Sequence, residues 1–192
     1  LFVSGGVNSL GGSGTLGAFT MTGGSLGGGG AVTLSGAGTW SNGTLGGGAG
    51  SLTVVTGGLL DVTAGGHTVS TGYTLGTSGT GRVKLSGGDI GFAGTGSKFV
   101  NGGVLEFAGD FSLSEGGNSN FVNNAGGVVT KTQGVGTSTI GLSNGSDAGG
   151  SYVVSAGKLR LAGGGTFTGT GTITASGGGT LVFGNNTSTL AA

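Results

Sequence analysis

The stretch VKLSGGDIGF (residues 83–92) carries the two features from which the fold of this chain can be inferred. Val83 and Leu85 alternate with a polar residue before a Ser-Gly-Gly step, and Ile90 and Phe92 flank a glycine after it. Alternation with period two places apolar side chains on one face of a half-buried strand. Glycine adopts positive φ without steric penalty, and a small polar side chain bonds to nearby backbone. The stretch therefore predicts two short strands joined by a tight corner.

The same pattern recurs at a fixed interval in five consecutive segments, which form a 15-residue repeat. They are TWSNGTLGG (39–47), VVTGGLLDV (54–62), VSTGYTLGT (69–77), KLSGGDIGF (84–92) and FVNGGVLEF (99–107). The seventh position is always aliphatic, and we expect a core column of Leu45, Leu60, Leu75, Ile90 and Leu105. The third position is always small and polar, and we expect a corner column of Ser41, Thr56, Thr71, Ser86 and Asn101. A fixed period with a fixed apolar position is the signature of stacked repeats.

Short strands, glycine corners and a fixed repeat predict an all-β chain folded as a parallel β-solenoid with glycine-rich corners. Helix is not expected, because no apolar face at 3.6-residue spacing occurs and Gly is too frequent. An antiparallel meander or sandwich is the alternative, although its hairpins prefer two-residue turns between longer strands. We expect residues 1–192 to form a single solenoid segment of a longer secreted protein, with the regular units at about 38–112. Whether a 15-residue unit is a whole coil or part of a larger coil stays open at this point.

Composition narrows the classes of function. The 192 residues include 55 Gly, no Pro and no Cys, with six basic and six acidic side chains. Apolar and β-branched residues along the whole length argue against disorder. Sparse, unclustered Lys and Arg argue against nucleic-acid binding, and the lack of a run of about 20 apolar residues argues against membrane insertion. Without Cys, a disulfide framework and a thiolate metal site are excluded.

Three longer stretches resemble a known group of repeats. The segments GAGTWSNGTLGGGAGSLTVVTGGLLDVTAGG (36–66), FVNNAGGVVTKTQGVGTSTI (121–140) and YVVSAGKLRLAGGGTFTGTGTITASGGGTLVFG (152–184) are similar to the strand repeats of autotransporter passengers and filamentous-haemagglutinin-like adhesins. This resemblance implies a right-handed parallel β-helix in a secreted bacterial protein, extracellular or at the cell surface, serving as a stalk, adhesin or fibre. The chain departs from enzymatic passengers, because it has no recognisable protease domain or catalytic motif.

Catalytic and metal-binding chemistry has little support in the sequence. The lone His67 has no second ligand nearby, and we expect it at the surface or at a corner. Glycoside hydrolysis needs two carboxyl groups about 5–9.5 Å apart, and the pairs to weigh are Asp61 with Glu106 and Asp89 with Asp110. No basic cluster accompanies either pair, so we expect isolated, solvated carboxylates. Six acids are also too sparse for a calcium site. We therefore expect no catalysis, metal or cofactor.

Two aromatic residues are candidate contacts for sugars. Tyr73 occupies a position otherwise held mostly by glycine, so we expect its ring to project outward. It is the best single candidate for contact with a host or surface glycan. Trp40 falls in an apolar column, so we expect it in the core or in a cap.

Three classes of function remain. We expect a stiff structural or adhesive segment without catalysis. A carbohydrate-binding or polysaccharide-degrading module is the alternative. An ice-binding solenoid is the third class, suggested by TFTGTGTIT (166–174), although these Thr residues run along one strand rather than across coils. Low charge leaves the end strands unprotected against edge pairing. The expected partners are therefore other copies of the chain, end to end or side by side, or the remainder of a longer chain.

Overall fold

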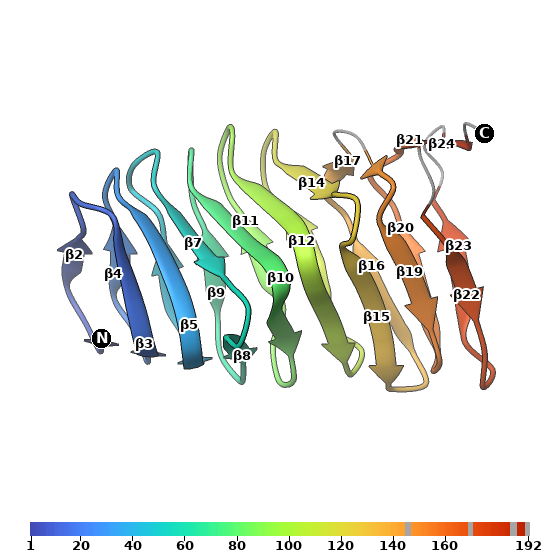
Figure 1. The fold of residues 1–192 in the computed structure, drawn as a ribbon, viewed down its shortest axis with the longest axis horizontal. Coiled ribbons are helices and arrows are strands. Elements are labelled where there is room, and N and C mark those ends of the chain that lie inside the picture. The colour runs from blue at the N-terminus through green and yellow to red at the C-terminus, as the bar shows by residue number, and fades with distance from the viewer. Residues whose placement is uncertain (145–146, 169–170, 185–187, 191–192) are drawn as a thin grey trace.

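The computed structural model describes residues 1–144, 147–168, 171–184 and 188–190. These residues form a parallel β-solenoid of about 8 turns, which confirms the predicted all-β solenoid. Strands of successive coils stack along the long axis, from the N-terminal end to the C-terminal end (Figure 1). Across these ranges there is no helix long and apolar enough to cross a membrane.

Each coil contributes three strand segments, and we name the three faces of the solenoid after them. Faces 1 and 2 are the two parts of one 12-stranded sheet. Face 1 contains β7 (Ser51–Val54), β14 (Asn120–Asn123), β17 (Ser143–Asn144) and the first parts of β3 (Gly14–Met21), β5 (Ala31–Trp40), β10 (Thr74–Leu85) and β12 (Lys98–Ala108). Face 2 contains the second parts of those four strands with β1 (Phe2–Val3), β8 (Leu59–Val62), β15 (Val128–Gln133), β19 (Ser151–Val154) and β22 (Ile173–Ala175).

Face 3 is a separate nine-stranded sheet. It consists of β2 (Val7–Ser9), β4 (Ser25–Gly27), β6 (Gly43–Leu45), β9 (His67–Val69), β11 (Ile90–Phe92), β13 (Leu113–Glu115), β16 (Thr137–Ile140), β20 (Lys158–Leu161) and β23 (Thr180–Phe183). A three-stranded sheet of β18 (Asp147–Ala148), β21 (Gly165–Thr168) and β24 (Ser188–Leu190) lies at the C-terminal end.

Long strands pass from face 1 to face 2 through a glycine-containing corner. In β10 the first part pairs with β7 and the second part with β8. The register of β10 against β12 shifts between Ser78 and Arg82, and Gly79 in this stretch has a φ of 60°. A side chain at that φ would be strained, so glycine is the residue that lets the strand turn there.

The coil is longer than the 15-residue repeat. Near the N-terminal end one coil runs from Val7 to its register partner Ser25, and in the middle of the chain one coil runs from Thr74 to Lys98. The strand segments of one such coil, β7 to β9, and the first segment of the next begin at positions 51, 59, 67 and 74. Each segment is thus about half of the repeat. One repeat therefore advances the chain by two segments, whereas a coil takes three.

This mismatch redistributes the five aliphatic residues that were expected to stack. All five are buried. The coil neighbours of Leu60, however, are Gly38 and Val83 rather than Leu45 and Leu75. The prediction of one column is therefore wrong, because successive members lie two segments apart in a three-segment coil. Face 3 holds Leu45 and Ile90, face 2 holds Leu60 and Leu105, and face 1 holds Leu75.

The five expected corner residues are redistributed in the same way. Four of them lie between strands, and they belong to three different corners: Ser41 and Ser86 follow face 2, Thr56 separates faces 1 and 2, and Thr71 precedes face 1. Asn101 is a correction, because it lies within β12 and its side chain is fully buried. Its neighbours along β12 face outward, so the alternation of the strand directs Asn101 into the core.

Asn101 belongs to a buried polar ladder across three coils. Thr77 Oγ1 donates a hydrogen bond to Asn101 Oδ1 at 2.6 Å, and Asn101 Nδ2 donates to Asn123 Oδ1 at 2.8 Å. The surrounding core is apolar, and the rings of Phe99 and Phe121 stack at 5.9 Å between centroids. Because the buried amides bond to one another, their burial carries little desolvation penalty.

Candidate functional site

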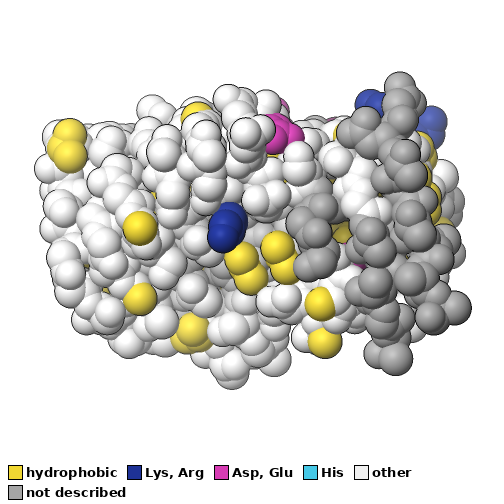
Figure 2. Space-filling view, turned by 90° about the horizontal axis from the view of Figure 1, so that it is seen from above, with side chains coloured by type: hydrophobic (Ala, Val, Ile, Leu, Met, Phe, Trp, Pro, Cys, Tyr) yellow, Lys and Arg dark blue, Asp and Glu magenta, His cyan; other side chains and the backbone are white. Residues whose placement is uncertain are grey.

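Charged side chains occupy only the middle of this chain. Asp61 is the first of the twelve and Arg160 is the last. Few of them appear on the side of the molecule seen in Figure 2. No group of three or more His, Asp or Glu within the described ranges is placed to hold a metal ion.

The first carboxylate pair lies in one outward column of face 2, but with a cation between its members. Asp61 is in register with Lys84, and Lys84 is in register with Glu106. Arg82, two positions before Lys84 on β10, forms an ion pair with Glu106 at 3.0 Å. The carboxylates are thus two coils apart, about 10 Å at the spacing of parallel strands. This column is a ladder of alternating charge on the outer side of the sheet, where the Arg82 side chain is 50% exposed, and ion pairs at such positions make small contributions to stability.

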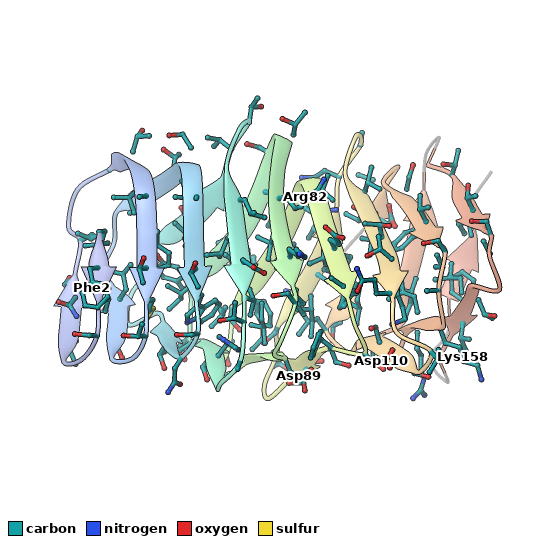
Figure 3. The ribbon with its side chains drawn as sticks, turned by 90° about the horizontal axis from the view of Figure 1, so that it is seen from below. Phe2, Arg82, Asp89, Asp110 and Lys158 are labelled. Atoms are coloured by element: carbon teal, nitrogen blue, oxygen red, sulfur yellow. The ribbon has the colours of Figure 1, made fainter. Side chains whose placement is uncertain are left out.

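The second carboxylate pair does not form either. Asp89 Oδ1 accepts a hydrogen bond from the backbone N–H of Ser112 at 2.8 Å, so Ser112 and not Asp110 is its neighbour in the next coil. Figure 3 labels Asp89 and Asp110 along the same edge of the solenoid, beyond face 2. Asp110 instead pairs with Lys131, whose Nζ lies 2.8 Å from its Oδ1.

Lys131 is the most unusual residue of the core. Its side chain is fully buried in the inward column that also holds Phe107 and Val154. The three N–H groups of the ammonium are shared among four oxygens: Asp110 Oδ1, Gly109 O at 2.8 Å, Gln133 O at 2.9 Å and Ser138 Oγ at 3.2 Å. Such a buried charge is tolerated only with this degree of pairing. We call Lys131, Asp110 and Ser138 the lysine clip.

The lysine clip fixes the corner that follows β15. Asp110 Oδ2 also accepts a hydrogen bond from the backbone N–H of Gly136 at 3.0 Å. The hydrogen bond from Lys131 holds the pKa of the Asp110 carboxyl below its ordinary value, and the one from Gly136 acts in the same direction. Ser138 Oγ donates to Gly109 O at 2.9 Å and is fully buried. The clip therefore joins two coils, and its serine is closed to a substrate.

His67 is buried, contrary to the expected surface or corner position. It begins β9 and points inward, because the alternation of this strand places it beside Val69 in the core. Its Nδ1 lies 2.9 Å from Asp89 O and its Nε2 lies 3.0 Å from Trp40 O. Both ring nitrogens face backbone carbonyl oxygens. Neither is available to a metal ion or to proton transfer with a ligand.

Tyr73 is also a correction, because its ring is buried rather than exposed. It precedes β10 at the corner between faces 3 and 1, and the chain turns the ring inward there. The ring lies under Gly50, where an added Cβ would be 3.2 Å from Tyr73 Cε2. Burial raises the pKa of Tyr73 to about 12. The ring of Tyr73 is therefore closed to a glycan in this structure. Trp40 lies in the core, as expected.

A hollow lies on the outer surface of face 1. It has a volume of about 520 Å³ and extends from β7 across β10 and β12 to Asn124, beyond the end of β14. Gly76 on β10 and Gly102 on β12 take two adjacent outward positions. The register partners of Gly76 are Thr53 and Val100, and the partner of Gly102 on β10 is Ser78. Gly76 is buried and Gly102 is half-buried, and neither glycine has a side chain that fills the hollow. Sequence reasoning missed it, because the glycines become neighbours only in the register of the coil.

A column of threonines across coils occurs at the N-terminal end of face 1. Thr15, Thr33 and Thr53 are in register, and Thr33 Oγ1 donates to Thr15 Oγ1 at 2.9 Å. The column ends at Gly76 in the next coil. Residues 169 and 170 of the Thr-rich stretch 166–174, which suggested ice binding, lie outside the described residues. The Thr column is thus three coils long, and it lies outside the Thr-rich stretch 166–174.

Comparison with known proteins found no match to a protein family, to a curated protein or to a solved structure.

Proposed function

We propose that this chain is a stiff structural segment of a bacterial cell-surface or extracellular protein, acting as a stalk or fibre section without catalysis. The observation that carries the proposal is the uninterrupted parallel pairing of coils along one axis, on face 2 from β1 to β22 and on face 3 from β2 to β23. About 8 turns at roughly 4.8 Å per coil give a segment about 38 Å long. Apolar columns hold successive coils together, and the buried ladder of Asn101 links three of them.

Further β-coils are the partners that fit the ends of this segment. No charged side chain precedes Asp61 or follows Arg160. Leu1, Phe2 and Val7 are exposed at one end, and Ile173 is exposed near the other. An uncharged strand edge with apolar side chains favours pairing with another strand. We propose that such coils come from an adjoining part of a longer chain or from another copy. The extracellular location is proposed from the resemblance of residues 36–66, 121–140 and 152–184 to secreted repeats.

Pulling on a single molecule tests the mechanical proposal. With handles at the two termini, the segment is expected to unravel in steps of one coil, each releasing a length of chain such as Val7 to Ser25 or Thr74 to Lys98. Leu60→Asp, which puts a charge between Gly38 and Val83, is expected to lower the unfolding force of the central coils. Thr44→Asp on the outer side of face 3 is the matched control and is expected to leave the force unchanged. A single all-or-none extension at low force would contradict a mechanical role.

A further inference from the structure

The geometry points to a binding site for a neutral oligosaccharide in the hollow of face 1. This inference goes beyond the mechanical function proposed above and does not depend on it. The volume of about 520 Å³ falls within the range of roughly 300–1,000 Å³ that small-molecule sites occupy. Because Gly76 and Gly102 are part of regular strands, the hollow is preformed and needs no rearrangement to admit a ligand.

Unused hydrogen-bonding groups converge on this hollow. Its rim carries the hydroxyls of Ser51, Thr53, Thr74 and Ser78 and the side-chain amide of Asn124. Within the described part of the chain, none of these five side chains forms a hydrogen bond to another protein group. The hydroxyls of Thr15 and Thr33, farther along face 1, bond to each other instead. The rim therefore offers donors and acceptors together, which is what a sugar with several hydroxyls requires.

The chemical character of the lining favours neutral sugars over charged ones. Its lining contains no Asp, Glu, Lys, Arg or His among the described residues. A carboxylated or sulfated glycan would lose hydration on entering and find no cation to replace it, so anionic polymers are disfavoured. The methyl groups of Val100 supply an apolar contact for the C–H side of a sugar ring. A neutral glycan is the ligand class that matches both features.

The extent of the hollow favours a short chain of sugars over a single ring. The lining residues come from successive coils, from Ala49 to Asn124. Three coil intervals at roughly 4.8 Å span about 14 Å. An extended oligosaccharide lying along the solenoid axis would contact the rim hydroxyls of successive coils in turn.

Calorimetric titration with tetrasaccharides tests this site. The probes are cellotetraose, laminaritetraose, maltotetraose and chitotetraose, and tetragalacturonate is the anionic comparison. We expect saturable binding of at least one neutral probe and none of tetragalacturonate. Thr53→Val with Thr74→Val keeps the shape of two rim side chains and removes both hydroxyls, so affinity is expected to fall by about tenfold or more.

Thr44→Val with Thr68→Val is the matched control, because these residues are register partners on the outer side of face 3. It is expected to bind as the unmodified chain does. Thermal unfolding of both double variants checks that each is folded. Failure of every neutral probe to bind overturns the inference, as does binding that the two double variants reduce equally. If the chain unfolds under force in steps of one coil but binds no sugar, this inference is contradicted and the mechanical proposal is not.

Discussion

Lys131 Nζ and Asp110 Oδ1 are 2.8 Å apart, yet the two residues lie in opposite environments. The Lys131 side chain is fully buried, whereas the Asp110 side chain is 41% exposed. Water can therefore solvate Asp110 if its partner is lost, but it cannot reach the ammonium of Lys131. Substitution of Lys131 and substitution of Asp110 should therefore change the stability of the fold by different amounts.

We expect Asp110→Ala to lower the melting temperature more than Lys131→Met does. Asp110→Ala leaves a buried ammonium with only neutral acceptors, the arrangement that costs most in buried pairs. Lys131→Met removes the charge and keeps a long apolar side chain in an apolar column. Arg82→Ala, which breaks the ion pair between the half-exposed Arg82 and Glu106, serves as the control and should cost less than about 1 kcal/mol. Equal losses from the two clip variants would show that Lys131 is not desolvated as placed.

The lysine clip also makes the stability of the fold depend on pH in the acidic range. The folded pKa of Asp110 lies below its unfolded value, so the clip stabilises the fold above about pH 4, the ordinary Asp value. This stability is lost as pH falls through the folded pKa. We therefore expect the difference in melting temperature between the unmodified chain and Asp110→Ala to shrink as the buffer is taken below about pH 4. A difference that stays constant down to pH about 2 would exclude an ionised Asp110 as the partner of Lys131.

The buried amide ladder gives a second stability prediction. Asn101→Ala removes both the acceptor of Thr77 Oγ1 and the donor to Asn123, so two buried polar groups lose a partner. We expect a loss of about 1–3 kcal/mol in the free energy of unfolding. Asn124→Ala is the control, because its half-buried amide has no partner among the described residues, and it should change stability by less than about 0.5 kcal/mol. Chemical denaturation measures the free energy of unfolding of both variants. A loss for Asn124→Ala as large as that for Asn101→Ala would contradict the assignment of the stabilising hydrogen bonds to Asn101.

The length of the coil can be measured by cross-linking on a background without cysteine. Thr44 and Thr68 are register partners on the outer side of face 3, one coil apart. Thr53 and Thr68 are separated by one 15-residue repeat but lie on faces 1 and 3. We expect dibromobimane to bridge Thr44→Cys/Thr68→Cys and to leave Thr53→Cys/Thr68→Cys unbridged. The opposite result would restore the 15-residue unit as the coil.

The fold class was predictable from the sequence because alternation and glycine corners are local signals. The stacking register was not, because it depends on which strands pair. The sequence pattern of one strand segment and its corner recurs two segments later, which is the 15-residue repeat, and also three segments later, which is one coil. Leu60 and Leu105, three 15-residue units apart, therefore lie on one face but two coils apart. Only the hydrogen bonding between coils distinguishes the two periods.

The candidate sites depend on that register even more strongly. Alternation in Val128–Gln133 places Lys131 on the same side as Val129, so its burial had a signal in the sequence. Its pairing with Asp110 had none, because that pairing follows from the length of the coil. The hollow depends on the same register, since Gly76 and Gly102 belong to different coils and become neighbours only when Ser78 aligns with Gly102. The wrong register also explains the error at Tyr73. Tyr73 aligns with glycines in the 15-residue repeat, but coils do not stack in that register, so the alignment did not indicate that the ring is buried.

The two tyrosines of the chain provide a test of the core at alkaline pH. Burial raises the pKa of Tyr73 to about 12. Burial also raises the pKa of Tyr152, as does the carboxylate of Asp147, which accepts a hydrogen bond from the Tyr152 hydroxyl at 2.7 Å. A folded pKa above the unfolded value of about 10 gives stability that is present below pH about 10 and is lost as pH rises through the folded pKa.

We therefore expect no tyrosinate absorbance near pH about 10, followed by a cooperative rise that coincides with loss of the β-sheet circular dichroism signal. Tyr73→Phe should move this alkaline transition to higher pH, since one of the two groups that destabilise the fold by ionising is gone. A gradual rise at pH about 10 with an unchanged circular dichroism spectrum would mean that a tyrosine is in contact with solvent. If Tyr73→Phe abolished that rise, the ring of Tyr73 would lie outside the core, where a glycan could reach it.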